Sequence, residues 1–167
     1  MSSPIKHSHH IFYATYVPRT YVLIKSSVLH KHPISSWDVS SVTIMEYMFY
    51  SASDFNQPIA NWNTSSVADM TGMFGDAESF NQQINAWDTS SATNMSSMFV
   101  NAFSFNSFLG HWDVSNVTNM NNMFAFATSF NQELEEYWDV NKVTDCGGFS
   151  SESKMKTKPK FTKCNPN

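Results

Sequence analysis

Three things are scarce in this sequence: long apolar runs, catalytic motifs, and basic residues in the central part of the chain. No run approaches the roughly 18 apolar residues that a membrane-spanning helix needs. No nucleophile elbow, phosphate-binding glycine loop, dinucleotide fingerprint or zinc-protease motif is found. The sequence therefore predicts no membrane span, no cofactor and no catalytic residue. The many carboxylates leave a hydrolase of surface polymers as an alternative, but they recur by period, whereas acid–base catalysis needs a unique pair.

The scarcity of basic residues limits the kind of partner. All 14 acidic residues lie between Asp38 and Glu152, and Lys142 is the only basic residue in that span. Nucleic-acid binding needs a basic surface, so this acidic body excludes nucleic acid as the partner of the central part. It favours a cationic partner or simple solubility.

The chain has only two cysteines, Cys146 and Cys164. Two interpretations are open. Cys146 is either a buried free thiol or one end of a bridge that fixes the C-terminal segment to the rest of the chain. A bridge would indicate an oxidising compartment.

What the sequence has in abundance is repetition, with a period of 25 residues. The same residue types return in the same order in each unit. The main columns are Trp37, Trp62, Trp87, Trp112 and Trp138; Met45, Met70, Met95, Met120 and finally Cys146; and Phe49, Phe74, Phe99 and Phe124. A fixed period of this size is the signature of stacked repeat units, in which Trp, Met and Phe are expected to stack on like residues.

Two local patterns occur within each unit. The spacing of Ile84, Trp87 and Thr89 matches the strand segment of a leucine-rich repeat. Apolar residues over 95–102 recur at i, i+3, i+4 and i+7, which predicts a short helix capped by residues such as Thr93. The predicted fold class is thus an α/β solenoid, a short right-handed leucine-rich-repeat-like stack with one parallel strand and one short helix per 25-residue coil.

The period also suggests how the chain is divided. Residues 1–32 are expected to form a degenerate N-terminal cap or a poorly ordered segment, and they contain no clear secretory signal. Residues 33–150 are expected to form the repeat solenoid, with four full coils and a partial one. Residues 151–167 are predicted to be a Lys-rich mobile tail.

The repeated motif W-D-V-S-x-V-T-x-M-x-x-M-F-x-x-A-x-x-F-N-Q, from Pro33 to about Phe149, resembles a known family. It is similar to the BspA-like leucine-rich-repeat surface proteins, in their 25-residue form known as a domain of unknown function. The resemblance implies display at the cell surface or secretion, and adhesion to proteins of a host, a matrix or a neighbouring cell. The missing signal leaves export as an expectation, or indicates a fragment of a longer chain.

One polar column is the candidate partner-binding strip. It follows each Trp and consists of Asp38, Asn63, Asp88, Asp113 and Asp139. Neighbouring coils would hold these residues about 5 Å apart, as a binding surface for a cationic protein or for Ca²⁺. No denser Asp motif or glycine-rich loop supports calcium. The competing interpretation is that each side chain only holds the Ser turn that follows it.

A second polar column, Asn56, Asn81, Asn106 and Asn131, is predicted to be structural, because loop backbone groups need partners. The function predicted from all of this is a non-enzymatic protein-binding module at the cell surface. The alternative is an intracellular or structural repeat scaffold that is not exported.

Overall fold

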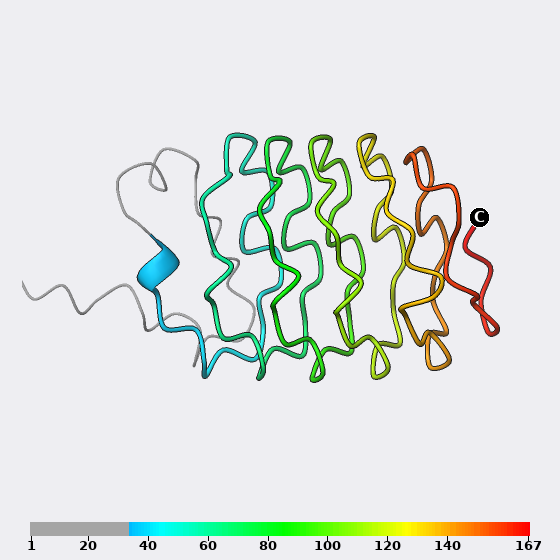
Figure 1. Ribbon diagram of the computed structural model, residues 1–167, viewed down its shortest axis with the longest axis horizontal. Helices are drawn as coiled ribbons and strands as arrows, with labels where there is room; N and C mark the ends of the chain where they lie inside the picture. The colour runs from blue at the N-terminus through cyan, green and yellow to red at the C-terminus, as the bar shows by residue number, and fades with distance from the viewer. Residues whose placement is uncertain (1–33) are drawn as a thin grey trace, which may run out of the picture.

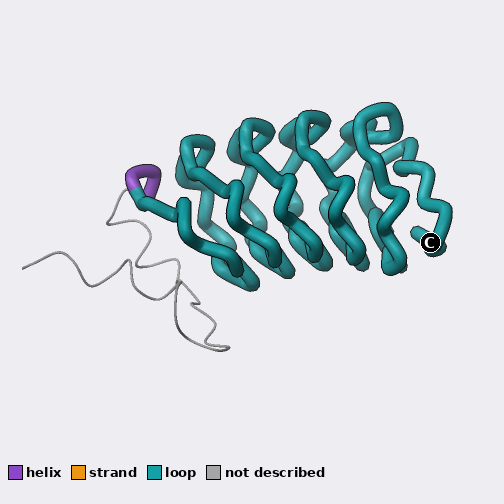
Figure 2. Tube along the Cα trace, turned by 90° about the horizontal axis from the view of Figure 1, so that it is seen from below, coloured by secondary structure: helices purple, strands orange, loops and turns teal. Residues whose placement is uncertain are grey.

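The structure, a computed structural model, describes residues 34–167. Successive coils lie side by side along the long axis, as both views show (Figures 1 and 2). Regular secondary structure is scarce in this part of the chain, which has one 3-10 helix, η2 (Ile34–Ser36), and no strand. None of its helical structure is long and apolar enough to cross a membrane. Four isolated parallel bridges join the coils, Ile44–Asp69, Asp69–Asn94, Asn94–Asn119 and Asn119–Asp145.

The predicted α/β solenoid with a strand and a short helix in each leucine-rich-repeat-like coil is therefore wrong. Residues 95–102, expected to be helical, form successive turns, and residues 84–89 form no strand. The helix is ruled out locally because Ser97 and Asn101 have φ angles of 55° and 56°. A residue in the left-handed region cannot continue a right-handed helix.

Backbone hydrogen bonds in this turn segment alternate between two directions. The N–H groups of Met98, Val100 and Ala102 donate to the carbonyl three residues earlier in the same coil. The N–H groups between them donate to the next coil, from Met95 to Asn119, Ser97 to Asn121, Phe99 to Met123 and Asn101 to Ala125, at 2.8 to 2.9 Å. Half of the backbone N–H groups in this segment therefore find their acceptor in the next coil, as in a sheet, and the other half find it within a turn of the same coil.

Left-handed residues recur at two positions of this segment. The first column holds Tyr47, Gly72, Ser97, Asn122 and Gly148, and the second holds Ser51, Asp76, Asn101, Phe126 and Glu152. Gly, Asn and Asp adopt this conformation at lower cost than other residues. Glycine at position 72 also avoids a clash, because a Cβ there would collide with the ring of Tyr47 in the preceding coil.

Aromatic rings that stack from coil to coil form the core. The ring centroids of Phe74 and Phe99 lie 5.6 Å apart, and those of Trp87 and Trp112 lie 6.4 Å apart, with nearly parallel planes. Each buried indole also has a partner, since Trp87 Nε1 donates to the Ile59 carbonyl of the preceding coil at 3.0 Å. The same bond recurs at Trp62, Trp112 and Trp138. The predicted stacking of Trp and Phe columns is confirmed.

The C-terminal segment lies against the last coil (Figure 1). A disulfide joins Cys146 to Cys164, and Cys146 is fully buried. Phe161 packs edge-on against Phe149 at 5.0 Å, so the segment covers the apolar end of the stack. The bridge is the interpretation that the structure supports. The predicted mobility of residues 151–167 and the boundary at residue 150 stay predictions, and the predicted cap at residues 1–32 lies outside the described residues.

Candidate functional site

The acidic strip, Asp38, Asn63, Asp88, Asp113 and Asp139, is exposed in every coil. These residues precede the turns that form the lower row of loops in Figure 1. The strip therefore presents one oxygen-bearing side chain per coil to solvent, as the sequence predicted.

Each strip side chain also holds a turn. Asp88 Oδ1 accepts hydrogen bonds from the backbone N–H of Ser90 at 3.0 Å and from the Ser90 hydroxyl at 2.6 Å. Asn63 accepts the same two bonds from Ser65. The backbone bond recurs at Asp38, Asp113 and Asp139. The structural interpretation of this column is confirmed, and it fixes the direction in which the remaining carboxylate oxygen is presented.

Buried threonines anchor the backbone beneath the strip. The hydroxyl of Thr64 donates to the Asp88 carbonyl at 2.9 Å, and the hydroxyl of Thr89 donates to the Asp113 carbonyl at 2.9 Å. Both threonines are buried. At Asp88 and Asp113 the spacing of the strip is therefore set by hydrogen bonds between coils.

The same turns lower the pKa of three carboxylates of the strip. Hydrogen bonds from the Ser40 hydroxyl and N–H lower the pKa of Asp38 below its ordinary value, because they stabilise the carboxylate. Ser90 and Ser115 lower the pKa of Asp88 and of Asp113 in the same way. The neighbouring Asp88 opposes the effect at Asp113, and Lys142 adds to it.

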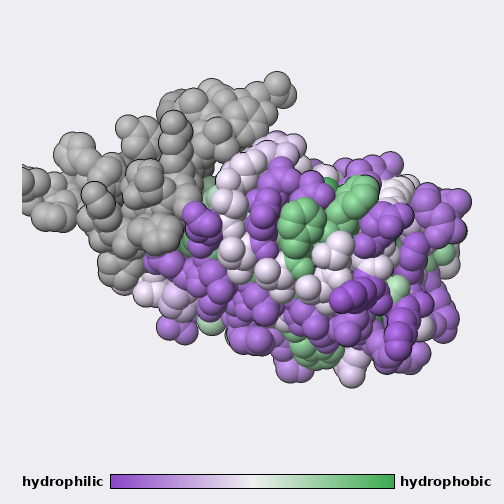
Figure 3. Space-filling model, turned by 90° about the horizontal axis from the view of Figure 1, so that it is seen from above, coloured by the Kyte–Doolittle hydropathy of each residue, from purple (hydrophilic) through white to green (hydrophobic). Residues whose placement is uncertain are grey.

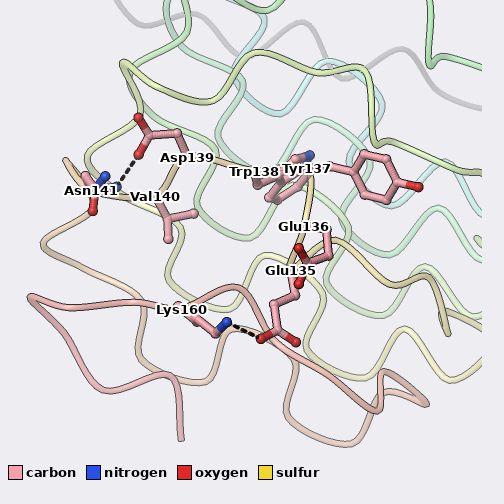
Figure 4. A pocket seen from close by; sticks show the side chains of 8 residues that line it. All are labelled: Glu135, Glu136, Tyr137, Trp138, Asp139, Val140, Asn141 and Lys160. Carbon is pink, nitrogen blue, oxygen red and sulfur yellow. Dashed lines mark hydrogen bonds and ion pairs between the residues drawn. The ribbon is translucent and has the colours of Figure 1, made fainter.

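A hollow of about 400 Å³ borders the C-terminal end of the strip (Figure 4). Asp139 lies on its rim, and Lys160 of the C-terminal segment pairs with Glu135 at 2.9 Å across it. The loop 133–137 is one residue longer than its counterparts, so this hollow breaks the period. The sequence showed the longer loop but did not predict that Lys160 would lie against it.

Sequence reasoning missed a second column of turn-holding side chains. Asp69 Oδ1 accepts from the N–H and the hydroxyl of Thr71, and Asn94 accepts from the N–H of Ser96. These residues form the parallel bridges, so they mark where the coils touch. The repeated Asp or Asn two residues before a hydrogen-bond donor was the available signal.

Threonines at the start of the turn segment were predicted to be helix caps, and that role is wrong because no helix follows. Thr93 Oγ1 instead donates to the Ala68 carbonyl of the preceding coil at 3.2 Å, and Thr118 Oγ1 does the same to Thr93. The structural role of the Asn column is confirmed. Asn56 Oδ1 accepts from the N–H of Asn81 at 3.0 Å, and the bond repeats at Asn106 and Asn131.

The described residues form no cluster of side chains suited to metal binding. Among residues 34–167, no three or more His, Cys, Asp or Glu side chains are grouped so that they could hold a metal ion.

Comparison with curated proteins and with solved structures found no match. Residues 20–137 and 84–159 match a family described as "Mycoplasma protein of unknown function, DUF285". These two overlapping matches cover most of the repeat region and more than half of the chain. The chain belongs to this family, DUF285.

Proposed function

We propose that this chain is a non-enzymatic protein-binding module displayed at the cell surface, where it acts in adhesion or recognition through the acidic strip. The observation that carries the proposal is the strip itself, one exposed oxygen-bearing side chain per coil, three of them with a lowered pKa. A row with four carboxylates, each held by the turn that follows it, favours a cationic protein surface through charge complementarity.

Two further observations support surface display. The resemblance of the repeated motif to BspA-like surface proteins implies it, and the Cys146–Cys164 disulfide fits an oxidising environment. Protease treatment of intact cells, followed by blotting, tests the location. Removal of the protein from intact cells is expected, whereas full protection would favour the intracellular scaffold.

Binding by the strip is tested separately with the purified full chain and immobilised deca-lysine as the cationic probe. The double variant Asp88→Asn, Asp113→Asn is expected to bind several-fold more weakly, and the difference is expected to shrink at high salt. Asn is the matched replacement because Asn63 makes the same turn with an amide. Equal binding by the wild type and the variant would contradict a role for the strip.

A further inference from the structure

Two exposed phenylalanines, Phe103 and Phe126, interrupt the polar surface at the end of the coils that lies opposite the acidic strip. They lie in the outer corner, which we define as residues 50–54, 75–79, 100–104, 125–129 and 150–154 and which forms the upper row of loops in Figure 1. Phe103 is 40 % exposed and Phe126 is 47 % exposed. Figure 3 looks onto this row and shows apolar side chains gathered among hydrophilic ones.

The fold does not require aromatic residues at these positions. The positions equivalent to Phe126 in the other coils hold Ser51, Asp76, Asn101 and Glu152. Phe126 has a φ of 59°, a conformation that costs free energy for a bulky residue. Because the ring is exposed, it contributes only part of the hydrophobic stabilisation that a buried ring would contribute. Stability therefore argues against Phe at position 126, and a function for the ring accounts for it.

Backbone bonds hold the two phenylalanines on neighbouring coils. The N–H of Asn101 donates to the Ala125 carbonyl at 2.9 Å, and the N–H of Phe103 donates to the Asn101 carbonyl at 2.9 Å. The N–H of Phe126 donates to Ser151 at 2.7 Å. The pair thus sits on a fixed backbone, and its rings are available without rearrangement of the coils.

The charge around the pair is mainly negative. The outer corner carries Asp54, Asp76, Glu78 and Glu152 against one basic residue, Lys154. The Asp76 carboxylate is held in place by Asn101 Nδ2, which donates to it at 2.6 Å. The Tyr50 hydroxyl also bonds to Asp76, and this bond raises the pKa of Tyr50. The fixed Asp76 carboxylate and Glu78 therefore lie in the coil next to Phe103, on the side away from Phe126.

We propose that Phe103 and Phe126 anchor a cationic peptide segment of a partner protein. An apolar side chain of the peptide packs against the two rings, and its Lys or Arg side chains reach the rings and the carboxylates of Asp76 and Glu78. The inference rests on the proposed protein-binding function but uses a surface separate from the acidic strip. An aromatic pair beside carboxylates selects a peptide that is both basic and apolar.

The test uses the full chain and a fluorescent synthetic peptide with the sequence of residues 154–163, which has five lysines together with Met155 and Phe161. The variants Phe126→Asn and Phe103→Thr copy Asn101 and Thr128 from the neighbouring coils. We expect the double variant to bind this peptide about tenfold more weakly. We expect Phe126→Asn to melt at the same temperature as the wild type or higher, because Asn tolerates the left-handed conformation.

Each other outcome is decisive. Unchanged binding by the double variant would overturn the proposal. Loss of binding only in Asp88→Asn, Asp113→Asn would place the peptide on the strip, which overturns this inference and leaves the proposed function standing. Phe-dependent binding of neutral maltoheptaose in place of the peptide would make the pair a glycan site. A lower melting temperature for Phe126→Asn would show that the ring is structural.

Discussion

The two ends of each coil differ in how strictly their residues repeat from coil to coil. At the strip end, almost every coil repeats the same residues, from the buried Trp to the Asp or Asn that holds the following turn. At the outer corner, the equivalent positions hold Ser51, Asp76, Asn101, Phe126 and Glu152. Positions whose side chains are buried or hold a turn are uniform because each side chain depends on a matching partner. The corner positions bond to the next coil through their backbone N–H groups, which leaves their side chains free to differ.

This contrast separates positions that build the stack from positions that give one coil its own chemistry. The strip belongs to both groups, since Asp88 holds a turn with one oxygen and its side chain remains exposed. The outer corner belongs to the second group. Substitutions should therefore affect stability strongly in the buried uniform columns and weakly at exposed positions.

The largest effect is expected from Trp87→Ala. It removes a ring stacked on both sides and leaves the Ile59 carbonyl without its partner. A loss of about 3–5 kcal/mol in the free energy of unfolding is expected for a large aromatic residue in a core, measured by chemical denaturation. Trp37→Ala is the matched control and should cost less, because Trp37 is only partly buried. An unchanged midpoint for Trp87→Ala would contradict the core assignment.

The last coil differs from the inner ones because a disulfide closes it. Cys164→Ser should lower the free energy of unfolding by about 2–4 kcal/mol, because it removes a cross-link over 18 residues. Wild-type protein in reductant should match the variant, and the variant should not respond to reductant. Equal stability of the oxidised and reduced wild type would show that the bridge does not secure this end.

A pair of adjacent glycines tests the left-handed column. Gly148→Ala should destabilise by about 1–2 kcal/mol, since Gly148 has a φ of 63° and a Cβ would collide with Asn122. Gly147→Ala should change the stability by less than about 0.5 kcal/mol, because its Cβ would meet only Asn121 Oδ1 at 3.4 Å. Thermal unfolding of the two variants measures the difference. Equal losses would mean that the turn geometry at position 148 is not left-handed.

The smallest effect is expected in the strip. Asp88→Ala should cost about 1 kcal/mol because the turn loses its acceptor, while Asp88→Asn should be nearly neutral, as Asn63 shows. Loss of stability in both variants, or in neither, would contradict this assignment of the turn.

The pKa of Asp88 is lowered by folding from an ordinary value of 3.8. Its stabilising contribution is therefore present above about pH 4 and is lost as the pH falls through the lower folded-state pKa. Acid titration of stability should thus be less steep in Asp88→Asn than in the wild type.

The sequence revealed the columns, because identical residues at a fixed period can only stack on one another. It also predicted the structural role of Asn81 and, as one of two competing interpretations, the turn that Asp88 holds. The helix at 95–102 failed because the apolar spacing of a helix is also produced by this turn segment. The contrary signal was present at the left-handed positions, where Gly72, Asn122 and Gly148 share one column and Asn101 lies in the other.

Other features depended on contacts that no period encodes. The hollow beside Asp139 requires both the longer loop and the C-terminal segment that the disulfide brings to it. The exposure of Phe103 and Phe126 depends on which way the outer corner faces, and that followed only from the turn geometry.

Hydrogen bonding between coils is tested most directly by NMR measurement of through-hydrogen-bond couplings from the amides of Met95, Ser97, Phe99 and Asn101. We expect couplings to the carbonyls of Asn119, Asn121, Met123 and Ala125 in the next coil. Couplings from these amides to carbonyls four residues earlier would indicate a helix in each coil and would contradict this fold.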